Sequence, residues 1–130
     1  MPHVPASRVR SMRWIAVALW AAVIFVLSSV PSSKIQVGVG GYGHFAEYAV
    51  LGGLLVFALT DTSRVLAAVA LASAFGVTDE LHQLLVPGRM ADPVDWAVDT
   101  AGAVVGAVVI AWLMRRSARR AARPARQAGR

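Results

Sequence analysis

The side chains most capable of chemistry in this chain lie inside stretches that are otherwise apolar. One such stretch ends with Asp79, Glu80, His82 and Gln83, and Arg89 follows shortly after them. A carboxylate beside an imidazole can move a proton, ligate a metal ion or hold a polar ligand. Because ionisable groups at membrane depth cost free energy, this segment predicts a functional site.

Two other apolar stretches carry further polar groups. As catalytic candidates we predict Glu47, Asp79 and His82. As ligand-binding candidates we predict His44, Glu80, Gln83, Arg89, Asp95 and Asp99. Five of these side chains are acids, and the bases near them in sequence are two histidines, one arginine and Lys34. Crowded carboxylates in a low dielectric must share protons, pair with arginine or bind a cation, so the acids exceed what internal ion pairs can balance.

The composition is that of a membrane protein. The chain has 130 residues, of which 57% are hydrophobic and 15% charged, whereas a soluble domain has about 45–50% apolar and about 25% charged residues. It contains no cysteine, which excludes disulfides and thiol chemistry. The net charge of +6 comes largely from arginines that flank the apolar stretches. Such flanks indicate membrane orientation or contact with anionic lipid headgroups, and no nucleic-acid partner is expected.

Four apolar stretches are long enough to cross a bilayer. They cover residues 14–30, 42–60, 65–86 and 94–114. A helix needs about 20 residues to cross a core of about 30 Å, and short connections favour antiparallel neighbours. We therefore predict an all-α, integral membrane, up-down four-helix bundle. Residues 1–13 form a basic cytoplasmic N-terminus, residues 14–114 the transmembrane domain, and residues 115–130 a basic cytoplasmic tail that is mobile at its end.

The basic flanks also predict location and topology. Arginines gather at both termini, so we expect a multi-pass protein of the bacterial cell membrane with both termini in the cytoplasm. A basic start before an apolar run is also typical of a signal peptide, but residues 14–30 exceed the usual length and Ser28-Ser29-Val30-Pro31 is a poor cleavage site. In the turn before the third span, Asp61 or Thr62 is expected to cap the helix.

Helical geometry predicts that the polar groups meet in one layer. Counted at 1.5 Å per residue from the basic end of each span, the polar groups lie about 21–30 Å up. Most of these polar groups fall on three helical stripes with i, i+3 or i+4 spacing. The stripes consist of His44, Glu47, Tyr48 and Leu51; of Asp79, His82, Gln83 and Val86; and of Asp95, Asp99, Gly102 and Gly106. We expect each stripe to face the bundle interior, with the polar groups in the extracytoplasmic third and small residues packing helices beneath them.

The motifs resemble those of the VanZ-like family. The matching residues are His44-Phe45-x-Glu47-Tyr48-x-x-Leu51-Gly52, then Asp79-Glu80-x-His82-Gln83-x-x-x-Pro87-Gly88-Arg89, then Asp95, Gly102 and Gly106. The resemblance implies a small multi-spanning bacterial membrane protein with a role at the cell envelope; the founding member is associated with low-level teicoplanin resistance. The family often has a lysine shortly before the histidine, where this chain has Gly40-Gly41-Tyr42-Gly43, and often asparagine at Asp99. Both differences make this site more acidic.

Three alternative functions fit these residues. In the first, the protein binds or modifies an envelope amphiphile, such as a lipid-linked cell-wall intermediate or a lipophilic drug. In the second, it is a membrane enzyme that uses acid–base or metal chemistry, although a divalent metal is not favoured because no His-Glu-x-x-His motif is present. In the third, it is a structural or partner-binding bundle without catalysis. A homodimer through the Gly102–Gly106 step is compatible with the sequence, although the same step packs helices within one chain.

Overall fold

The computed structural model of the chain contains four helices. It describes residues 5–31, 33 and 40–127, and in these ranges every regular element is helical. The helices are α1 (Ala6–Ser28), α2 (Gly40–Leu59), α3 (Val65–Gln83) and α4 (Pro93–Gln127). Each is long and apolar enough to cross a membrane, which confirms the prediction of an all-α, four-helix membrane protein.

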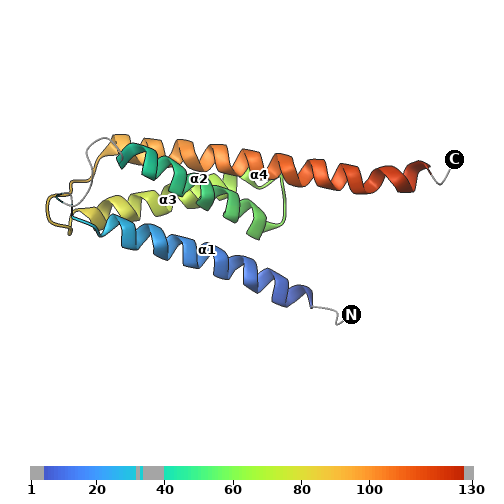
Figure 1. Cartoon of the computed structure of the whole chain (residues 1–130), viewed down its shortest axis with the longest axis horizontal. Coiled ribbons are helices and arrows are strands. Elements are labelled where there is room, and N and C mark those ends of the chain that lie inside the picture. Colours follow the sequence, from blue (N-terminus) through green and yellow to red (C-terminus); the bar gives the residue numbers. More distant parts are fainter. Residues whose placement is uncertain (1–4, 32, 34–39, 128–130) are drawn as a thin grey trace.

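The helices alternate in direction along the chain. In Figure 1, α2 and α4 run one way and α1 and α3 run the other way. The start of α1, the turn between α2 and α3, and the end of α4 therefore lie at one end of the bundle, which we call the terminal end. The connection between α3 and α4 lies at the other end, which we call the loop end.

Direct contact between α2 and α4 forms the centre of the bundle. Gly102 of α4 faces the backbone of Phe45, and Gly106 faces the backbone carbonyl of Ala49. A Cβ atom at either glycine would collide with the backbone of α2. The absence of side chains at these two positions is therefore what allows the two parallel helices to approach so closely, as small residues do in other membrane helix pairs.

The first helix is peripheral. In the described part of the chain α1 packs against α2 and the end of α3, and its backbone makes no close approach to α4. Among the described side chains of α1, only Val17, Ile24 and Ser28 are buried, whereas apolar side chains such as Leu19 and Val26 are exposed. In a bilayer this exposed surface contacts acyl chains. Helices α2, α3 and α4 therefore form a three-helix unit, and α1 packs on the side of this unit, so the bundle is not a symmetric square.

The last helix is longer than its apolar span. We expected the fourth span to end at Met114, but α4 continues to Gln127 and extends beyond the other helices (Figure 1). Alanine and arginine both have high helix propensity, which accounts for the continuation. The helix begins at Pro93, so its 35 residues measure about 52 Å, well over the bilayer core of about 30 Å. At the other terminus α1 begins at Ala6, earlier than expected.

The capping prediction for α3 is wrong. The residue at the N-cap is Arg64, and no side chain caps the helix. Asp61 instead accepts hydrogen bonds from the hydroxyl of Ser63 at 2.7 Å and from its backbone N–H at 2.8 Å. These two bonds, with a smaller contribution from Arg64, hold the pKa of the Asp61 carboxyl below its usual value. The carboxylate therefore orders the turn that leads into α3 without capping it.

Substitution of Gly106 by valine tests the α2–α4 contact. The new side chain would point at the backbone of Ala49, so we expect Gly106→Val to lower the free energy of unfolding by about 1–3 kcal/mol or more. The measurement is a denaturant titration of the purified protein in mixed micelles. Ala101→Val on the exposed face of α4 is the matched control and should change little. Equal stability of the two variants would contradict this packing.

Candidate functional site

The polar side chains meet at the loop end of the bundle. On one side, α1 and α3 are joined by a buried hydrogen bond in which Ser28 Oγ donates to Asp79 Oδ2 at 2.7 Å. The Gln83 amide, one turn further along α3, lies 3.5 Å from the same oxygen. Asp79 and Gln83 are each only 1% exposed, so these groups lie inside the protein and not against acyl chains.

The imidazole of His82 lies next to this pair. Its Nε2 is 2.9 Å from Ser29 Oγ at the end of α1, and its ring stacks on Phe25 with the centroids 3.9 Å apart. Serine and phenylalanine therefore fix the orientation of the ring. His82 makes no direct hydrogen bond to Asp79 or Glu47 in the described residues, so the three predicted catalytic side chains do not form a connected triad.

The opposite side of the layer joins α2 to α4. His44 Nδ1 lies 3.1 Å from Asp99 Oδ1, and both side chains are buried. The two residues are 55 positions apart in sequence, and the close approach of α2 and α4 at Gly102 brings them together. An imidazole held by a buried carboxylate is the arrangement in which histidine is oriented for proton transfer or ligand contact.

The loop that follows α3 is tied to this layer by two side chains. Glu80 Oε2 accepts a hydrogen bond from the backbone N–H of Asp92 at 2.7 Å, just before α4 begins. Arg89 donates from Nε to the carbonyl oxygen of Val30 at 3.2 Å, which connects the loop to the end of α1. Arg89 thus contacts a backbone group and makes no ion pair with Glu80 or Asp95 among the described residues.

Tyr48 lies among the carboxylates. Its side chain is fully buried, and its hydroxyl lies close to Gly76 of α3. The list of predicted site residues omitted this tyrosine, together with Ser28 and Ser29. The sequence feature that indicates Tyr48 as a site residue is its position four residues after His44 on the same helical stripe.

Several buried oxygens in this layer have no hydrogen-bond partner among the described residues. They are Asp79 Oδ1, Glu80 Oε1, Asp99 Oδ2 and the Tyr48 hydroxyl. Burying a carboxylate oxygen without a hydrogen-bond donor is costly. Helices α3 and α4 therefore present carboxylate acceptors, and α2 presents a hydroxyl that can donate or accept, to a region where a group that supplies donors would be stabilised.

The remaining candidates occupy the margin of the layer. Glu47 and Asp95 are half-buried, and the backbone carbonyl of Glu47 accepts a hydrogen bond from the Trp20 indole at 2.8 Å. Lys34 lies outside the described residues. Within the described ranges, no three histidine or acidic side chains gather closely enough to hold a metal ion.

Burial agrees with most of each helical face that the sequence predicted. His44, Tyr48 and Leu51 are buried on α2, and Asp99 and Gly102 are buried on α4, whereas Glu47, His82, Asp95 and Gly106 of the same stripes are half-buried. Hydrogen bonds between helices join the polar groups in two pairs, Ser28 with Asp79 and His44 with Asp99. The roles assigned to these residues stay a prediction.

The comparisons with known proteins place this chain in a sequence family. A family model described as VanZ/LLP1 matches residues 7–115. Comparisons with curated proteins and with solved structures found no match. The matched range includes every candidate side chain and the apolar part of all four helices.

A double-mutant cycle tests the bond between α1 and α3. We expect Ser28→Ala and Asp79→Ala to show a coupling free energy of about 0.6–1.7 kcal/mol, from the average to the maximum found for hydrogen bonds between membrane helices. The measurement is unfolding in mixed micelles for the wild type, both single variants and the double variant. The corresponding cycle on Ser29 and Asp79, for which the described residues show no hydrogen bond between the two side chains, is the control. Additive effects of Ser28→Ala and Asp79→Ala would show that their bond contributes nothing.

Proposed function

We propose that this chain, which belongs to the VanZ/LLP1 family, binds the polar headgroup of an envelope amphiphile in the layer between the loop ends of its helices. It has the four membrane-capable helices expected of a multi-pass membrane protein. The amphiphile would place its headgroup among the carboxylates and its tail against the apolar outer surface of the bundle.

One observation carries this proposal: the buried acceptors that lack a partner. Asp79, Glu80 and Asp99 each leave one carboxylate oxygen without a donor among the described residues, and the Tyr48 hydroxyl is also unpartnered. Acceptors select ligands that donate, such as ammonium, hydroxyl or amide groups. The excess of acids over bases favours a headgroup with positive charge, because unpaired carboxylates in a low dielectric are costly.

Topology supports the same ligand class. Arginines gather near the start of α1 and beyond the apolar span of α4, whereas Arg89 lies in the loop after α3. The positive-inside rule therefore predicts that both termini are cytoplasmic and that the polar layer lies near the outer leaflet. A headgroup at that depth with its tail in the bilayer fits an amphiphile better than a soluble metabolite. Lipid-linked cell-wall intermediates and lipophilic antibiotics belong to this class. Binding of such a molecule would account for a contribution to teicoplanin resistance.

Two alternatives also have structural support. The His44–Asp99 pair favours modification of the bound headgroup by proton transfer, since the carboxylate orients the imidazole. The bonds between helices, such as Ser28 to Asp79, favour a structural bundle without a ligand. Packing alone, however, does not require carboxylate oxygens that are buried and left without donors.

Photo-crosslinking with two matched probes tests the proposal. Both carry the same diazirine-bearing acyl chain; one headgroup is an aminosugar and the other is a methyl phosphodiester, which has no hydrogen-bond donor. We expect the aminosugar probe to label the loop end of α2 or α3 and the phosphodiester probe to label it several-fold less. Equal labelling by both probes would contradict a site that selects donors.

Substitutions in the polar layer provide the second test. Asp99→Asn and Glu80→Gln should each reduce aminosugar labelling by about tenfold, the equivalent of one charge-assisted hydrogen bond of about 1.5 kcal/mol. Ser73→Ala, which removes the bond from Ser73 to Thr100 lower in the bundle, is the control. The same variants are compared for teicoplanin sensitivity at equal membrane abundance. If labelling and sensitivity follow protein abundance alone, the bundle is structural.

A further inference from the structure

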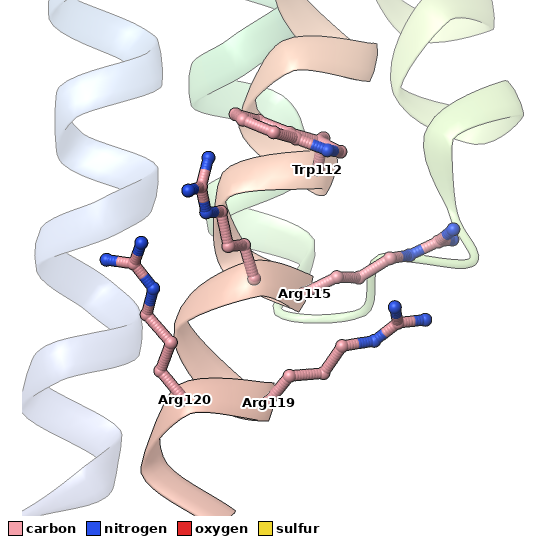
Figure 2. A pocket seen from close by; sticks show the side chains of 5 residues that line it. Trp112, Arg115, Arg119 and Arg120 are labelled. Atoms are coloured by element: carbon pink, nitrogen blue, oxygen red, sulfur yellow. The ribbon is translucent and has the colours of Figure 1, made fainter. Parts of the chain in front are cut away.

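A second polar site lies at the terminal end, far from the layer described above. There, side chains at the end of the apolar span of α4 and just beyond it line a hollow of about 610 Å³. The residues that line it are Trp112, Arg115, Arg116, Arg119 and Arg120 (Figure 2). Among the described residues no acidic side chain lines this hollow, and all four arginines are exposed.

The guanidinium groups are spread around the helix. Figure 2 shows Arg115 and Arg119 extending side by side toward the turn between α2 and α3, and Arg120 extending toward α1. Arg115 donates to the backbone carbonyl of Thr62 at 2.7 Å, which fixes its direction. The Arg116 guanidinium lies over the Trp112 ring, 5.1 Å from its centroid. Two of the four cations are therefore positioned by the protein itself.

In the described part of the chain, no acidic side chain forms an ion pair with the arginines of this hollow. Arg115 and Arg119, and likewise Arg116 and Arg120, stand four residues apart on one helix, where like charges repel. The nearby hollow lined by Arg10, Trp14 and Arg64 differs, because Asp61 lines it too and forms an ion pair with Arg64 at 3.5 Å. An external anion would relieve the repulsion on α4.

The level of the hollow relative to the membrane indicates which kind of anion it binds. The apolar span of α4 ends at Met114, and Trp112 just before it is a residue typical of the membrane interface. The arginines therefore lie at the level of the lipid phosphates. We infer that these arginines bind the phosphates of anionic phospholipids in the leaflet on the side of the termini, with Arg115 and Arg119 on one side of α4 and Arg120 on the other. Arginine forks hold phosphate through paired hydrogen bonds, and this contact anchors the extended part of α4 to the membrane surface.

Lipid retention by the purified full chain tests this inference. Delipidated protein in detergent is mixed with phosphatidylglycerol or with phosphatidylcholine, and bound lipid is counted by native mass spectrometry. We expect Arg119→Gln combined with Arg120→Gln to reduce the affinity for phosphatidylglycerol by about tenfold and to leave phosphatidylcholine unchanged. Arg8→Gln combined with Arg10→Gln removes the same charge from the other terminus and should reduce affinity less than twofold. Equal losses for the two double variants would overturn the inference.

Two further measurements distinguish a specific phosphate-binding site from general electrostatic attraction. Arg119→Lys combined with Arg120→Lys keeps the charge but removes the planar forks, so we expect a loss of about threefold to fivefold. Wild-type affinity in the lysine variant would overturn the inference, because charge alone would then account for binding. Inorganic phosphate at the concentration of the lipid should not displace phosphatidylglycerol. Displacement by phosphate would overturn the assignment to a lipid.

Discussion

The contact between the backbones of α2 and α4 is the constraint on which the rest of this structure depends. In a membrane, apolar side chains gain little by leaving lipid, so helices associate through close packing and hydrogen bonds. Gly102 and Gly106 leave room for the backbone of α2 at Phe45 and Ala49. That approach also sets the distance between the loop ends of the two helices, and so it determines that His44 can reach Asp99 across 55 residues of sequence.

The polar layer combines two kinds of group. Some side chains satisfy each other across helices, as Ser28 does for Asp79, and these bonds hold α1 and α3 in register. Other atoms, including Asp99 Oδ2 and the Tyr48 hydroxyl, are buried without a hydrogen-bond partner in the described residues. The first kind builds the bundle. In the function that we propose, the second kind contacts the ligand, and binding would recover the free energy that unpaired buried acceptors cost.

The two ends of the bundle have opposite chemistry. Carboxylates dominate the loop end, whereas arginines such as Arg115 and Arg119 surround the hollow at the terminal end. The apolar body of α2 and α4 separates them, so neither set neutralises the other. This polarity suits a protein that is held at one membrane surface through its cations and meets a donor-rich headgroup near the other surface through its acids.

Local sequence information was enough to predict the four spans, most of the buried helix faces and the level of the polar groups along their helices, because hydropathy, 3.6-residue periodicity and a rise of 1.5 Å per residue depend only on local order. It also revealed that acids exceed bases among the predicted site residues. The partners could be assigned from the fold alone: His44 pairs with Asp99, His82 stacks on Phe25 and contacts Ser29, and α1 packs at the side of the other helices. Hydrogen-bond partners depend on how helices are rotated and how closely they approach, and those quantities follow from packing between residues distant in sequence.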